Sequence, residues 1–130
     1  MAKTKEAAKL STLQEYRQAI SANPKSAEAQ SNLGWGLYGE GQWDEAIKAF
    51  NDALNLDANQ VDALYGLALT RKSAGAKSEA VAAFDKTVAL LATQTADPSR
   101  SKVLMRLARG HVNLIQSGHW QLSNVLGGEL

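Results

Sequence analysis

Cysteine is absent from this chain of 130 residues, so disulfides, thiolate catalysis and thiolate metal sites are all excluded. Neither sign of charge dominates, because the formal net charge is +1, and no global basic field draws the chain to nucleic acid. No apolar run approaches the ~20 residues that a membrane helix needs. A secretion signal is also missing. We therefore expect a cytoplasmic protein without a membrane partner.

Residue sets that carry catalysis are missing as well. No nucleophile stands in a pattern with a base and an orienting group. Gly34-x-Gly36 falls inside a helical pattern, without the strand that precedes a phosphate-binding loop. His111 and His119 are too far apart in the sequence for a helical metal-binding pair, which needs a separation of three or four residues. We expect neither an enzyme nor a cofactor or metal site, and we interpret His111 as part of an apolar helix face.

What the chain does contain is a pattern with a fixed period of about 34 residues. The first copy is Leu33, Gly34, Gly41, Ala46 and Phe50, and it returns as Leu67, Ala68, Gly75, Ala80 and Phe84. Each copy has apolar positions three and four residues apart, which indicates two amphipathic helices joined at a glycine. Gly118 followed by Trp120 echoes Gly41 followed by Trp43, and it marks a third copy with an insertion.

The same spacing predicts where the helices begin and end. Ser26 and Asn59 are expected N-caps, and Asp97 followed by Pro98 combines an N-cap with proline at the first helical position. Asn23-Pro24 is expected to end the first helix, because proline disfavours helix in the residue before it. The expected helices cover residues 3–23, 26–40, 42–56, 59–75, 78–91, 98–117 and, as a short remnant, 120–126.

These residues resemble the tetratricopeptide repeat (TPR) family, whose pattern is Leu-Gly, a glycine turn, Ala-x-x-x-Phe and a closing proline. Gln30, Ala58 and Ala92 depart from that pattern. The resemblance implies an all-α fold, a right-handed stack of antiparallel helix pairs (a TPR-like α-solenoid) with about two full repeats and flanking partial repeats. We assign one domain over residues 1–130, with a half repeat at 1–24, repeats at 27–60 and 61–94, and a divergent, truncated third repeat at 95–130.

In such a stack the first helix of every repeat lines one groove. Helical geometry places one row of positions on the groove flank, roughly 100° from the core stripe. The row contains Trp35, Tyr38, Tyr65, Leu69, Lys72, Met105 and Val112. We therefore expect an adaptor or scaffold module for protein–protein interaction, which binds a peptide or helix of a partner protein in this groove. The alternative interpretation is that these side chains only pack against one another.

Other interactions stay open on the sequence alone. Some TPR proteins hold acidic chain ends in a clamp of basic residues, but the matching positions here are Ser31, Trp35, Asp62 and Gly66, so we do not expect that clamp. Self-association through the unpaired first helix or through residues 120–126 is a second hypothesis, because about three repeats are needed for stability. A basic helix face of Lys102, Arg106 and Arg109 is a distant route to nucleic acid or an acidic partner.

Overall fold

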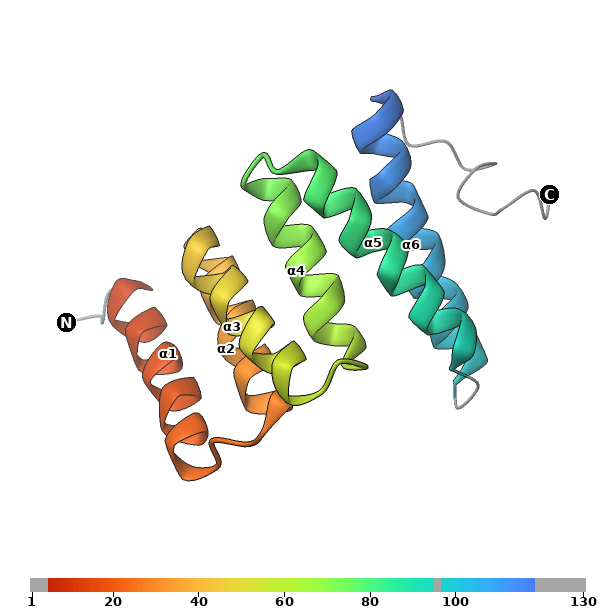
Figure 1. Ribbon diagram of the computed structural model, residues 1–130. Helices are drawn as coiled ribbons and strands as arrows, with labels where there is room; N and C mark the ends of the chain where they lie inside the picture. The colour runs from red at the N-terminus through yellow and green to blue at the C-terminus, as the bar shows by residue number, and fades with distance from the viewer. Residues whose placement is uncertain (1–4, 95–96, 119–130) are drawn as a thin grey trace. The chain divides into compact units, whose positions relative to one another are not determined.

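Six α-helices make up the computed structural model, which describes residues 5–94 and 97–118, and side chains from Thr12 onward (Figure 1). The helices are α1 Lys5–Ala22, α2 Ala27–Gly39, α3 Trp43–Leu56, α4 Val61–Ser73, α5 Lys77–Thr93 and α6 Pro98–Ser117. No strand occurs among these residues, and the predicted all-α class is confirmed. The chain divides into two compact units, one up to Gly66 and one from Leu67 onward, and α4 runs from the first into the second.

Local signals in the sequence explain where several helices begin. The Ser26 hydroxyl accepts a hydrogen bond from the Ala29 N–H at 3.1 Å, so Ser26 is the N-cap of α2 as predicted. The Asp97 carboxylate accepts a bond from the Arg100 N–H at 3.0 Å and caps α6, with Pro98 at its start. Both side chains satisfy backbone donors that the first turn of a helix leaves unpaired.

The expected N-cap at Asn59 is wrong. The helix begins two residues later, at Val61, and the backbone N–H of Asn59 donates instead to the Asp57 carboxylate at 3.0 Å. The Asp57 side chain therefore stabilises a local turn that includes Asn59. Asn59 belongs to this turn and does not cap α4. The short helix expected over residues 120–126 lies outside the described residues.

Glycines end three helices in the same way. Gly41, Gly75 and Gly118 have φ angles of 75°, 85° and 77°, a left-handed conformation that glycine adopts at no steric cost. The first two turns also share their hydrogen bonds, because Gln42 N–H bonds to the Leu37 carbonyl and Ala76 N–H to the Arg71 carbonyl. The matching of Gly118 with Gly41 is thus supported by backbone geometry as well as by sequence spacing.

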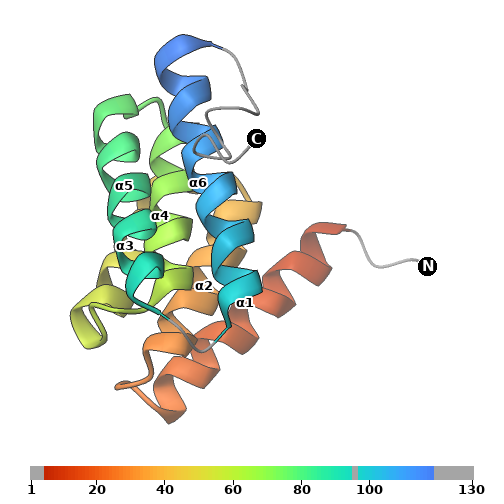
Figure 2. The ribbon, with the colours of Figure 1, turned by 90° about the vertical axis from the view of Figure 1, so that its right-hand side faces the viewer.

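In the first unit α2 packs beside both α1 and α3 (Figures 1 and 2). Glycines allow this close approach, because a Cβ on Gly36 would lie 2.8 Å from the Tyr16 ring and one on Gly34 would lie 2.7 Å from the Phe50 ring. Phe50 is fully buried, and Leu37 is 2% exposed. The core of this unit therefore combines one phenylalanine ring with closely packed glycines and alanines and with buried leucines such as Leu37.

In the second unit α5 and α6 run side by side (Figures 1 and 2). Phe84 and Ala108 are fully buried there, and Leu91 is 3% exposed. Thr87 is also fully buried, and its hydroxyl donates to the Ala83 carbonyl at 2.8 Å, which removes the cost of an unpaired polar group. Phe84 thus stands at the core position that Phe50 holds one repeat earlier.

Candidate functional site

Aromatic side chains gather on α2 and at the start of α3 in the first unit. The Trp35 ring meets Tyr38 edge-on with centroids 5.8 Å apart, and it meets Phe50 edge-on at 5.4 Å. Tyr38 also contacts Trp43 at 5.4 Å. Edge-to-face pairs at these separations are favourable beyond the area that they bury. The buried Phe50 therefore anchors a chain of rings whose outer members, Trp35, Tyr38 and Trp43, remain partly exposed.

Tyr65 joins this group from α4, within the same unit. Burial raises the pKa of Tyr65 above its usual value, and the neighbouring Tyr38 raises it further. Both effects penalise the phenolate form, so the Tyr65 hydroxyl stays protonated at neutral pH. We define the aromatic face as Trp35, Tyr38 and Tyr65, three predicted groove residues that are each partly exposed.

The predicted groove residues of the second unit do not form one group. Lys72, in the last turn of α4, contacts His111 of α6. Met105 lies in a hollow beside Leu91 and Ala92 of α5, and Val112 lies in a neighbouring hollow beside Asp85 of α5. Met105 and Val112 therefore stand on the side of α6 that borders α5, whereas Lys72 reaches α6 from α4. Whether Leu69, Lys72, Met105 and Val112 contact a partner stays a prediction.

Sequence reasoning missed the surroundings of His111. Its ring stacks on Phe84 with centroids 5.0 Å apart and an interplanar angle of 9°. The Lys72 ammonium group donates a hydrogen bond to His111 Nδ1 at 2.9 Å. An ammonium group carries only donors, so Nδ1 must be the unprotonated nitrogen of a neutral ring. The spacing of His111 in the sequence carries no signal for either contact, because both depend on how α6 is rotated about its axis.

The pKa of His111 falls from 6.5 to about 4, first because of burial and second because of the Lys72 charge. Above about pH 6.5 the ring is neutral in both the folded and the unfolded chain, so it adds nothing to the pH dependence. Between about pH 6.5 and 4 the unfolded chain binds a proton here and the folded chain does not. We therefore expect the folded state to lose about 1–2 kcal/mol as the pH falls through this window, a figure reduced because solvent screens the partly exposed ring.

The variant His111→Phe is the matched control for this prediction. Phenylalanine keeps a ring against Phe84 and cannot bind a proton, so its melting temperature should fall less than that of the unchanged chain between about pH 7 and 4.5. Differential scanning calorimetry of both chains measures the difference. Parallel pH curves for the two chains would show that His111 does not titrate as described.

Within the part of the chain that the structure describes, no three side chains of His, Cys, Asp or Glu come together as a metal site. None of the described helices has the length and apolar character needed to cross a membrane. The features left for a functional site are the aromatic face of the first unit and the surface where α5 meets α6 in the second.

Comparison with known proteins finds similarity to repeats in the middle of the chain. A family model described as "TPR repeat" matches residues 37–75, and one described as "Tetratricopeptide repeat" matches residues 62–90. Among solved structures, the TPR domain of Arabidopsis OM64 is similar with a TM-score of 0.64 at 20% identity, over 82% of this chain and 85% of that one. The search of curated proteins gave no match. The predicted TPR-like fold is confirmed, and residues 37–90 are similar to tetratricopeptide repeats, which generally mediate interactions between proteins.

Proposed function

We propose that this protein binds a peptide or helix of a partner protein through the aromatic face, Trp35, Tyr38 and Tyr65. The observation that carries the proposal is the partial exposure of these rings. Large aromatic side chains are the residue types that most often dominate the binding energy of protein interfaces. They also offer a wide contact area with few rotatable bonds, so binding costs little side-chain conformational entropy.

The packing of the first unit supports this role. Trp35 rests edge-on against the buried Phe50, and Tyr38 is held between Trp35 and Trp43. These contacts fix the rings before a partner arrives, which lowers the entropic cost of association. Leu69 and Lys72 follow Tyr65 along α4 at four and seven residues, a spacing that places all three on one side of this helix. We propose that they extend the contact surface, with Lys72 as a polar residue at its edge.

The experiment is a pull-down with the immobilised chain in an extract of its own cells. Trp35→Ala and Tyr65→Ala should each abolish capture of the partner, because each removes an anchoring ring. Asn55→Ala, at an exposed position of α3, is the control and should capture as much partner as the unchanged chain. Circular dichroism must show unchanged helix content for every variant. Partner capture by both ring variants at the level of the control would refute the proposed face.

A further inference from the structure

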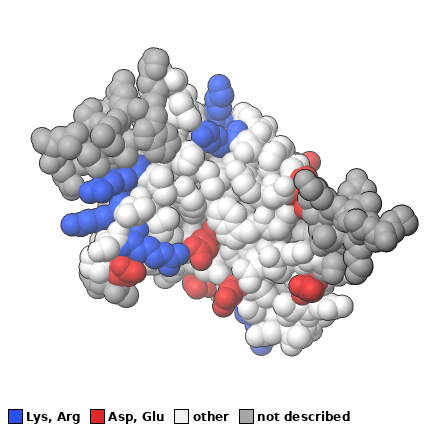
Figure 3. All heavy atoms as spheres, turned by 180° about the vertical axis from the view of Figure 1, so that it is seen from behind, with Lys and Arg blue, Asp and Glu red and all other residues white. Residues whose placement is uncertain are grey.

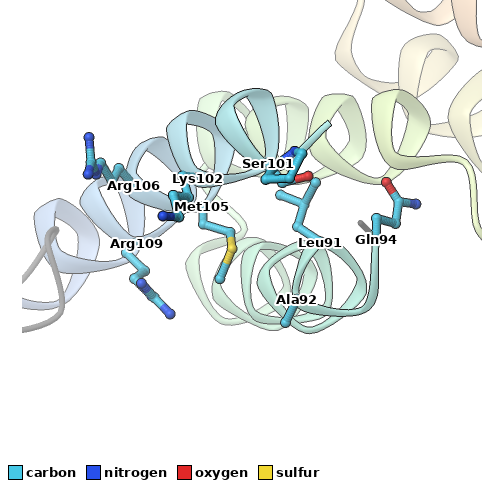
Figure 4. Close-up of a pocket in the computed structure, with 9 residues that line it drawn as sticks. Leu91, Ala92, Gln94, Ser101, Lys102, Met105, Arg106 and Arg109 are labelled. Carbon is cyan, nitrogen blue, oxygen red and sulfur yellow. The ribbon is translucent and has the colours of Figure 1, made fainter. Parts of the chain in front are cut away.

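A hollow in the second unit lies where the end of α5 meets the beginning of α6, and it has a cavity volume of about 330 Å³. Its apolar lining comes from Leu91 and Ala92 of α5 and from Pro98 and Met105 of α6. Figure 4 shows the Met105 and Leu91 side chains directed into the space between the two helices. Leu91 is buried and Met105 is partly exposed, so the hollow has an apolar floor that solvent can reach. Its size suits one large apolar side chain of a bound segment.

The charged residues that line this hollow all have the same sign. They are Lys102, Arg106 and Arg109 of α6, and the lining contains no carboxylate. Figure 4 shows Arg109 leaving α6 on the same side as Met105, whereas Arg106 points away from α5. Among the described residues, neither Lys102 nor Arg109 takes part in an ion pair. Lys102 and Arg109 are therefore the two cations best placed to meet a ligand on the apolar floor.

The positive charge is local, because the chain as a whole carries a net charge of only +1. Figure 3 shows several Lys and Arg side chains on the left of the view, with Asp and Glu side chains next to them. A cationic rim around an apolar floor is complementary to a segment that carries acidic groups on both sides of an apolar one. Protein interfaces commonly have an apolar side chain buried in a central pocket and polar or charged contacts at the rim.

We propose that this hollow is a second binding site, and that its ligand is an acidic peptide segment with one large apolar residue among its carboxylates. The apolar side chain enters between Leu91 and Met105, and the carboxylates meet Lys102 and Arg109. A nucleic acid fits less well, because the hollow holds no aromatic side chain on which a base could stack. The site is built from the α5 side of α6, and it shares no residue with the aromatic face of the proposed function.

The test measures binding of a fluorescein-labelled peptide, Glu-Asp-Leu-Asp-Glu, to the full chain by fluorescence polarisation. The double variant Lys102→Gln/Arg109→Gln should weaken peptide binding by about ten-fold or more, since it removes two charge-assisted contacts. Lys86→Gln removes the same charge from an exposed position of α5 that does not line the hollow, and it should weaken peptide binding by less than about three-fold. Replacing the leucine of the peptide with serine should weaken it by about ten-fold.

Each contrary result overturns the proposal. An absence of saturable peptide binding would show that the hollow is not a site, and equal losses in Lys86→Gln and the double variant would show a diffuse attraction to positive charge. Equal affinity for the serine peptide would show that the apolar floor is not used. If a labelled single-stranded oligonucleotide bound more tightly than the peptide, Lys102 and Arg109 would be contacts for nucleic acid and the proposal would be wrong. Trp35→Ala should leave peptide binding unchanged, which separates failure here from failure of the proposed function.

Discussion

Replacing Phe50 with alanine should lower the free energy of unfolding of the first unit by about 3–5 kcal/mol. Phe50 is fully buried, with Gly34 and Gly66 against its ring and Trp35 at its edge. Gly34 and Gly66 have no side chains that could move into the space that the ring leaves. The loss therefore includes both the transfer of the ring to water and the cavity that remains.

Urea unfolding followed by tryptophan fluorescence measures this effect, because Trp35 and Trp43 lie in the same unit. Phe50→Leu is the matched variant, and it should cost clearly less because leucine refills part of the space. A loss below about 1 kcal/mol for Phe50→Ala would mean that the ring is not the centre of this core.

Gly66→Ala should be the second most damaging change, with a loss of about 1–3 kcal/mol. A Cβ at this position would lie 2.4 Å from Cζ of Phe50, far inside van der Waals contact. The ring cannot move away, because a Cβ built on Gly34 would lie 2.7 Å from two of its carbons, which shows how closely the α2 backbone approaches it. Alanine favours helix over glycine by up to about 1 kcal/mol, but this gain is smaller than the cost of the clash.

Two further variants isolate the clash as the cause. Gly39→Ala adds the same methyl group to α2, where nothing lies within 4 Å, and it should stabilise the chain by about 0.5–1 kcal/mol. Phe50→Leu combined with Gly66→Ala should cost less than the sum of the two single changes, because the smaller side chain leaves room for the methyl group. Strict additivity of the two changes would show that Gly66 and Phe50 do not compete for space.

The sequence predicted the features that depend on local chemistry. The caps at Ser26 and Asp97 and the glycine turns at Gly41 and Gly75 could be found because each needs only a few neighbouring residues. The burial of Phe50 and Phe84 followed from the spacing of apolar residues within a repeat.

Features that depend on how helices rotate and meet could not be found in this way. The contact of His111 with Phe84 and Lys72 joins three helices, and no spacing within α6 encodes it. The insertion before Gly118 also leaves the register of α6 open, so the sequence grouped Met105 and Val112 with Lys72 although they border α5. The pocket at the meeting of α5 and α6 was missed for the same reason, since its apolar floor comes from two helices.

The central claim is that the aromatic face contacts another protein, and crosslinking from Tyr38 tests it most directly. A photoreactive benzoylphenylalanine replaces Tyr38 in one chain and the exposed Asn55 in a control chain. After irradiation in an extract of the source cells, mass spectrometry identifies what is attached to each. The account predicts a defined partner protein joined at position 38 and little or none at position 55. Equal products at both positions, or only a second copy of this chain joined at position 38, would contradict it.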